Sequence, residues 1–315
     1  MSHEIEMVNG QAQMAWVDAG EGTPWHNLGV RVDENISPEE MMKVAGLDWS
    51  VSKKDLSYEG IIVPNKKALV RDTDNKLLDI VGNEWTPVQN KEAFDFFTEF
   101  CDAGSMKMHT AGSLFDGKRI WALAKVASDF TVFGEDRVEG YLLFSNPHKF
   151  GHCVDVRFTP IRVVCNNTLT MSLNTKAQNF AKVNHRGEFD PSAVKEILGL
   201  AENSMDEYKA VAEFLGSKQV SDAKFKEFLG KVFGESKKED KMTRNAELAY
   251  EAFETQPGAE FAPGSWWQAI NAVTYITDHK MGRSNESRLN NVWFGHARKS
   301  KINAVKEAVK FAEAA

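Results

Sequence analysis

IWALAKV at residues 120–126 and GYLLF at residues 140–144 are the two runs that decide the fold. Both are rich in aliphatic and aromatic residues and are bounded by Gly, Asp or Asn, as buried β-strands are. Comparable runs fill the chain from about residue 106 to residue 156, and others lie at 49–58, 60–70, 77–81 and 180–185. The pair Asp116-Gly117 favours a two-residue hairpin turn between two such runs, because both residues tolerate positive φ. The patterns predict a mainly antiparallel sheet.

Helical signals flank this sheet and then dominate the chain. Ser37-Pro38-Glu39-Glu40 supplies an N-cap, a first-turn proline and a capping-box glutamate, so a helix is expected up to Gly46. A second helix is expected at about 90–101. Further helices are expected at about 190–215, at 221–233, up to 255, from a capping box at Ser265, and at 299–315. We therefore predict an α+β fold, in which an N-terminal mixed region with a mainly antiparallel sheet is followed by a helical C-terminal third. The predicted domains are 1–189 and 190–315, with a linker candidate at 235–241.

The stretch TPIRVVCNNTL at 159–169 carries the most informative polar residues. Its apolar residues recur at spacings of three and four, which predicts a helix over 160–173, although the residue types also suit a strand. On such a helix Arg162 and Asn166 share one polar face, and Arg157 lies just before it. Arginines beside amides and hydroxyls are suited to phosphate, whereas a buried polar network is the structural alternative. The predicted phosphate or nucleic-acid set is Arg157, Arg162, Asn166, Asn167, Thr168, Lys176 and Lys182.

Charge is unevenly distributed along the chain. The net charge is −7, and residues 1–60 alone hold eleven Asp/Glu against four Lys/Arg. Residues 141–190 and 276–310 are locally basic, which allows local anion binding but does not describe a strongly basic protein; solvated helix faces are the alternative. Three aromatic residues in or near the basic range 141–190 are candidates for stacking on bases: Trp121, Tyr141 and Phe144. The second stretch predicts a basic rim made of Lys280, Arg283, Arg288, Arg298 and Lys299.

Two chemical motifs fail on inspection. GSLFDGKR at 112–119 nearly matches a phosphate-binding P-loop, but Arg119 follows the lysine where a hydroxyl is needed, and the next residues are strand-like. His148, His152, Cys153 and Cys165 match no familiar zinc spacing, so no metal and no cofactor are expected. Cys165 lies on an apolar stripe, where cysteine usually acts as a small hydrophobe rather than a nucleophile.

Compartment signals are few. The sequence has three cysteines, an odd and sparse set that predicts a reducing cytoplasm. It has no apolar run of about 20 residues, so no membrane span is expected. Its start is acidic and lacks an apolar core, so no signal peptide is expected.

Five strings in this order resemble one family: WHNLG at 25–29, PVQN at 87–90, AGSL at 111–114, TPIRVVCNNTL at 159–169 and WFG at 293–295. The chain resembles the phage/plasmid-like protein family, also called domain of unknown function 932. The resemblance implies a mobile-element origin and a host bacterial cytoplasm. It supplies no activity and no catalytic residues.

Three functions stay open. The leading hypothesis is a nucleic-acid-binding accessory protein of a phage or plasmid, for replication, recombination or strand protection, with single-stranded DNA or another nucleic acid as partner. The second is an enzyme acting on a nucleotide or small phosphorylated ligand, with His148 or His152 as general acid or base. The third is an assembly or host-interaction (anti-defence) protein that uses the acidic first sixty residues. A homo-oligomer is expected, a host protein partner is an alternative, and whether the protein is an enzyme stays undecided.

Overall fold

The computed structural model describes residues 5–17, 28–102, 104–162, 167–168, 180–185, 205–236, 241–281, 291–292 and 295–314, with the backbone alone at 128, 162, 167–168 and 180–183. The chain divides into two compact units, each described here by itself. Unit 1 comprises 1–127, 141–158 and 180–199, and unit 2 comprises 128–140, 159–179 and 200–315. Strands gather in the N-terminal part of the chain and helices in its C-terminal third, so the predicted α+β class is confirmed.

The largest sheet has eight strands in the order β12-β11-β10-β9-β8-β3-β4, with β13 also paired to β11. β8 pairs antiparallel with β3 and with β9, and β11 pairs antiparallel with β12 and with β13, whereas β3 and β4 are parallel. The strands of this sheet are β3 (Met14–Val17), β4 (Val30–Val32), β8 (Met106–Leu114), β9 (Arg119–Val132), β10 (Asp136–Pro147), β11 (Val154–Arg162), β12 (Asn167–Thr168) and β13 (Phe180–Val183). A short hairpin of β1 (Met7–Val8) and β2 (Gln11–Ala12) precedes them.

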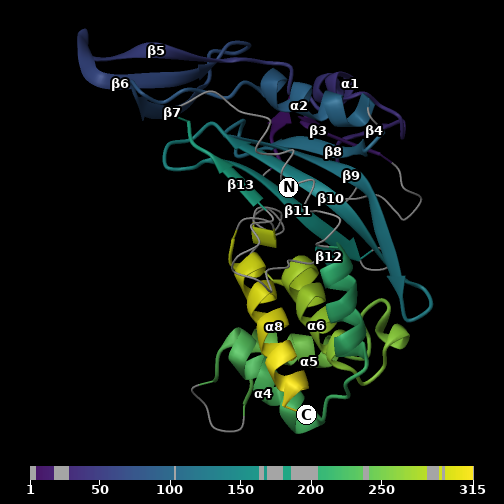
Figure 1. Cartoon of the computed structure of the whole chain (residues 1–315). Coiled ribbons are helices and arrows are strands. Elements are labelled where there is room, and N and C mark those ends of the chain that lie inside the picture. Colours follow the sequence, from purple (N-terminus) through teal and green to yellow (C-terminus); the bar gives the residue numbers. More distant parts are fainter. Residues whose placement is uncertain are drawn as a thin grey trace. The chain divides into compact units, whose positions relative to one another are not determined.

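Two helices of unit 1, α1 (Pro38–Val44) and α2 (Asn90–Asp102), lie side by side against β8 (Figure 1). The capping box predicted for α1 is confirmed, because Ser37 Oγ accepts the Glu40 N–H and the Glu40 carboxylate accepts the Ser37 N–H. The apolar face of α2 is buried, and Phe97 meets Phe144 of β10 edge-on at 6.0 Å between ring centroids. These contacts form the core on the helical side of the sheet.

A second, three-stranded sheet in unit 1 has the order β5-β6-β7, formed by β5 (Val51–Tyr58), β6 (Ile61–Arg71) and β7 (Leu77–Gly82). Glu59 and Gly60 both have positive φ, as a tight hairpin turn requires. β7 pairs with residues 66–70 of β6, so the β5–β6 hairpin continues beyond it as a two-stranded arm. The tip of this arm is apolar and open to solvent, with Tyr58 70% exposed.

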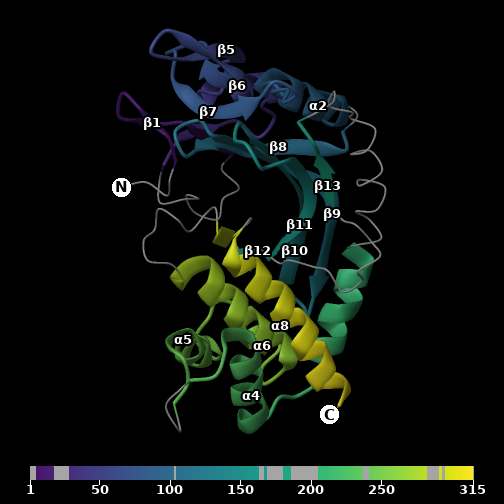
Figure 2. The same cartoon turned by 90° about the vertical axis from the view of Figure 1, so that its left-hand side faces the viewer.

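The helices of unit 2 pack against one another (Figure 2). Two buried tryptophans, Trp266 and Trp267, lie in their core. Trp266 stacks on Phe311 at 5.4 Å and meets Phe228 edge-on. The tip of the β9–β10 hairpin belongs to this unit, and Asp136 there accepts a 2.8 Å hydrogen bond from the Trp267 indole. None of the described helices has the length and apolar content needed to cross a bilayer. The helical elements are a helix at 205–216, α4 (Asp222–Phe233), α5 (Arg244–Ala252), η3 (Ala259–Phe261), α6 (Trp266–Tyr275), the π-helical η4 (Ile276–Lys280) and α8 (His296–Glu313).

The helix predicted over 160–173 is wrong where the structure describes it. Residues 160–162 continue β11, and Asn167 and Thr168 form β12, which pairs with Arg162 and Ile161. The β-branched residues of this stretch favour a strand over the apolar spacing that favoured a helix. Pro160 is tolerated because the pairing with β13 ends at Arg157 and that with β12 begins at Ile161.

Candidate functional site

The site begins at the turn between β8 and β9. The run that resembled a P-loop is a hairpin, because Leu114 pairs with Arg119 and the turn between them has positive φ at Phe115, Asp116 and Gly117. Gly117 has a φ of 87°, which favours glycine, and a Cβ there would lie 2.9 Å from Arg71 Nη1, so the Arg71 side chain would have to shift. The Lys118 N–H donates to the Phe115 carbonyl at 3.3 Å, so Asp116 and Gly117 are the two central residues of the turn, as predicted. Arg119 is the first residue of β9.

The loop between β10 and β11 is tied to this turn. The His148 N–H donates to the Lys118 carbonyl at 2.9 Å, and the Phe150 N–H donates to Asp79 Oδ2 at 2.8 Å. The His148 ring is completely buried and donates from Nε2 to Asn90 Oδ1 at 2.9 Å. Anchored on both sides of its tip, the loop presents its exposed residues from a fixed backbone.

Two guanidinium groups and one carboxylate lie beside this loop. Arg119 donates to Ser145 Oγ at 3.2 Å, and its Nη2 lies 3.4 Å from His152 Nδ1. Arg157 grips Asp155 in a bidentate pair, with Nε donating to Oδ1 at 2.7 Å. Both side chains of this pair are only 12% exposed. Two guanidinium groups therefore lie close together beside the loop, with the Asp155 carboxylate bound to one of them.

Burial and neighbouring charges shift the protonation of this cluster. Burial lowers the pKa of Arg119 to about 10; the negative charge of Asp155 opposes this shift and the positive charge of Arg157 adds to it. Burial also lowers the pKa of His152, and the positive charges of Arg119 and Lys149 lower it further, while Asp79 raises it. A nearby anion would reverse both shifts, since it stabilises the charged forms.

Only part of the predicted phosphate set comes together here. Arg157 lies in β11, and Lys182 of β13 occupies the register position opposite Asp155. Both belong to unit 1, whereas residues 159–179, which contain the other five members, belong to unit 2. Arg162, Asn167 and Thr168 are strand residues described by backbone alone, and Asn166 and Lys176 lie outside the described residues.

The predicted basic rim is described at three of its five members. Lys280 ends η4 and lies over the Tyr275 ring at 5.8 Å, while Arg298 and Lys299 lie in the first turn of α8. Arg283 and Arg288 lie outside the described residues. Sequence reasoning missed Lys301, which is buried in an ion pair with Asp278 at 2.7 Å and whose pKa is lowered by burial. Because it is buried, this pair belongs to the packing of α8 against η4.

The aromatic residues expected to stack on bases are buried. Trp121, Tyr141 and Phe144 are each less than 5% exposed, so that expectation is wrong. Phe150, which the sequence analysis did not single out, is 61% exposed in the anchored loop. Its signal in the sequence is the run HKFGH at 148–152, where one aromatic residue stands among basic residues beside a glycine.

The two histidines predicted as general acid or base differ in exposure, and only His148 is unsuited to that role; for His152 it stays a prediction. Burial lowers the pKa of His148 to about 3, so this ring is neutral at physiological pH and hidden from solvent. His152 is exposed but lies against Arg119. Cys153 Sγ donates to Asn184 Oδ1 at 3.2 Å, and Cys165 lies outside the described residues. Across the described ranges, no three His, Cys, Asp or Glu side chains are grouped to hold a metal ion.

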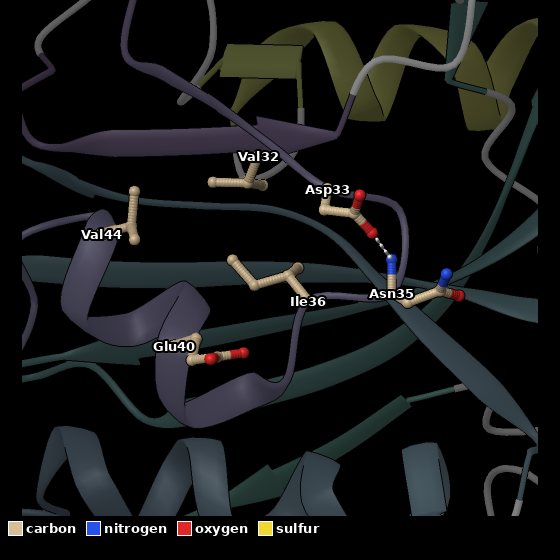
Figure 3. Close-up of a pocket in the computed structure, with 6 residues that line it drawn as sticks. All are labelled: Val32, Asp33, Asn35, Ile36, Glu40 and Val44. Carbon is tan, nitrogen blue, oxygen red and sulfur yellow. Dashed lines mark hydrogen bonds between the residues drawn. The ribbon is translucent and has the colours of Figure 1, made fainter.

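A hollow of about 450 Å³ lies between β4 and α1 (Figure 3). It is lined by Val32, Asp33, Asn35, Ile36, Glu40 and Val44. Its two carboxylates already accept backbone N–H groups, from Asn35 at 2.9 Å and from Ser37 at 3.2 Å. These carboxylates would repel a phosphate, so the hollow offers no alternative anion site.

The described residues thus define an α+β protein whose antiparallel sheet carries a half-buried cationic cluster beside an exposed aromatic ring. A family model described as "Domain of unknown function (DUF932)" matches residues 77–293, which is more than half of the chain, and the chain belongs to this family. The resemblance seen in the sequence is confirmed. No curated protein and no solved structure matches the chain. The matched segment contains Arg119, Phe150, Arg157 and Lys182.

Proposed function

We propose that this protein binds nucleic acid, as an accessory protein of a phage or plasmid in a host cytoplasm, and that Arg119, Arg157 and Lys182 contact its phosphates. The observation that carries the proposal is the grouping of the Arg119 and Arg157 guanidiniums beside the His152 ring, a cluster in which a phosphate would stabilise the charged forms. Phosphate is the anion whose geometry matches a guanidinium fork.

Partial burial favours such binding. An ion pair formed at a half-buried site is screened less by salt than one on the open surface. Asp155 does not block Arg157, because a guanidinium has five N–H donors and one arginine can serve a carboxylate and a phosphate together. Asp155 instead holds Arg157 in place, which lowers the entropy cost of binding.

Fluorescence anisotropy with labelled single- and double-stranded DNA and RNA at two salt concentrations tests the proposal. We expect salt-dependent binding of at least one polymer. Arg119→Gln should weaken it about tenfold and lower the salt slope by about one. The matched control is Arg137→Gln, which removes the same charge from an exposed pair with Asp129 and should leave both quantities unchanged.

Inorganic phosphate and a mononucleotide, added as competitors, separate a polymer from a small phosphorylated ligand. Competition only at millimolar concentrations supports the polymer, whose affinity is the sum of many phosphate contacts. If micromolar mononucleotide displaces the labelled polymer, the site binds a small phosphorylated ligand instead. Absence of binding to all four polymers at low salt would refute the proposed function.

A further inference from the structure

Phe150 combines exposure with a fixed backbone. Its side chain is 61% exposed, whereas the aromatic residues of the nearby strands are buried. The loop that carries it is held by the His148 N–H on the Lys118 carbonyl and by the Phe150 N–H on Asp79 Oδ2. Gly151 follows with a φ of 78°, a conformation that turns the chain back toward β11 and that other residues rarely adopt. An aromatic ring held in solvent on a fixed backbone is available to stack on another ring.

The surroundings of Phe150 are cationic. Lys149 precedes it and is exposed, and His152 follows two positions later against the guanidinium of Arg119. The charges of Arg119 and Lys149 both act on His152, so both cations lie near its ring. The Asp79 carboxylate accepts the Phe150 N–H and is the negative group on this side of the loop. A partner that stacks on the ring and carries phosphates beside it would gain from the positive charges of Lys149 and Arg119.

We propose that Phe150 is a stacking platform for a nucleobase, and that the polymer bound is therefore single-stranded; this inference rests on the proposed function. A base in a duplex is covered on both faces by its neighbours, while a base in a single strand has a face to offer. With its base on Phe150, a nucleotide places its flanking phosphates among Lys149, His152 and Arg119. Stacking needs no base-edge hydrogen bonds, so little sequence preference is expected.

The test compares Phe150→Ala with Tyr58→Ala, since both remove an exposed aromatic ring but Tyr58 lies at the tip of the β5–β6 arm. The probes are an unstructured oligothymidine and a hairpin duplex of similar charge. We expect Phe150→Ala to weaken single-strand binding about tenfold or more without changing the salt slope, because the ring carries no charge. Phe150→Trp should retain affinity, and Tyr58→Ala should behave as wild type.

The outcomes separate this inference from the function beneath it. If the unmodified protein binds no nucleic acid, the proposed function and the stacking role of Phe150 are both refuted. If it binds a single strand and Phe150→Ala binds equally well, the stacking platform is refuted while the proposed function stands. Equal loss on oligothymidine and duplex would also overturn the single-strand assignment. Unchanged binding together with a lower molar mass in light scattering would assign the ring to contact between protein copies.

Discussion

Two arginines of unit 1 show how one residue type serves two purposes. Arg71 donates to Glu6 at 2.7 Å and grips Asp74 through Nε and Nη2, and Ser113 completes the network by donating to Glu6. The hydrogen bonds to Asp74 and Glu6 outweigh the effect of burial, so the pKa of Arg71 is raised above its ordinary value. Burial lowers the pKa of Arg119 instead.

The difference lies in the immediate surroundings of the two guanidinium groups. Arg71 donates directly to two carboxylates, Glu6 and Asp74, and the pair with Glu6 holds β6 to the N-terminal segment. Arg119 donates to the Ser145 hydroxyl, and the positive charge of Arg157 adds to the effect of burial on its pKa. A phosphate beside Arg119 would oppose that shift, because it stabilises the charged guanidinium. We therefore expect Arg71 to act mainly on stability and Arg119 mainly on binding.

The largest expected effect is on the stability of the Arg71 network. Arg71→Gln leaves Glu6, which is 2% exposed, without its main counter-charge, and should lower the free energy of unfolding by about 3–5 kcal/mol. Arg119→Gln removes a charge that burial already disfavours, so it should change stability by less than about 1 kcal/mol. Urea unfolding followed by circular dichroism measures both.

A double variant controls for the buried charge. Glu6→Gln with Arg71→Gln removes both partners, and it should recover part of the stability lost in the single variant. If Arg71→Gln and Arg119→Gln lower the free energy of unfolding equally, both arginines are structural and the contrast between them is refuted.

The second largest effect is on the pH dependence of stability, to which His148 and His152 should contribute differently. His148 is buried with a pKa of about 3, while an unfolded histidine titrates near 6.5. Below pH 6.5 the unfolded chain therefore takes up a proton that the folded protein refuses. The free energy of unfolding should fall by about 1.4 kcal/mol per pH unit from this group as the pH drops from 6.5 toward 3.

Unfolding at several pH values isolates this contribution. His148→Gln should reduce the slope of stability against pH by about one proton, since the remaining carboxylates and His185 titrate alike in both proteins. His152→Gln should reduce that slope by less, because the His152 ring is exposed, although burial and the charges of Arg119 and Lys149 lower its pKa. An identical slope in His148→Gln and wild type would show that His148 is protonated in the fold.

The parts of the fold that local chemistry specifies were predictable from the sequence. The Ser37 capping box, the Asp116-Gly117 turn and the strand runs each depend on a few neighbouring residues, and all three are present. At Ser265 the cap forms, but Gln268 reaches the Gly264 N–H instead of the Ser265 N–H. The 160–173 stretch failed because its apolar spacing fits a helix and its β-branched residues fit a strand, and strand pairing decides between them.

The site was predictable only in part, because it depends on contacts between distant residues. Arg119 drew attention in the sequence only as the residue that spoils a P-loop, and its neighbours Ser145 and His152 lie 26 and 33 positions away. Trp121 and Tyr141 were candidates by residue type, yet the sheet buries them. Exposure is a property of the whole packing, so sequence composition could not distinguish Phe150 from these residues.

The smallest expected effect tests whether phosphate reaches the Arg119 cluster through His152. In the free protein the pKa of His152 is lowered by burial and by the charges of Arg119 and Lys149, with Asp79 opposing them. A bound phosphate raises that pKa, so binding takes up a proton. Affinity should then increase a few-fold, roughly two- to fivefold, as the pH falls from 8 to 5.5 at constant ionic strength.

His152→Gln provides the comparison, because glutamine keeps a polar side chain without titrating in this range. Its affinity for the same oligonucleotide should stay flat with pH. Arg119, with a pKa of about 10, remains charged throughout, and His148, with a pKa of about 3, remains neutral, so neither contributes a trend. If wild type and His152→Gln share one pH profile, the phosphate does not contact His152 and the binding surface lies elsewhere on the sheet.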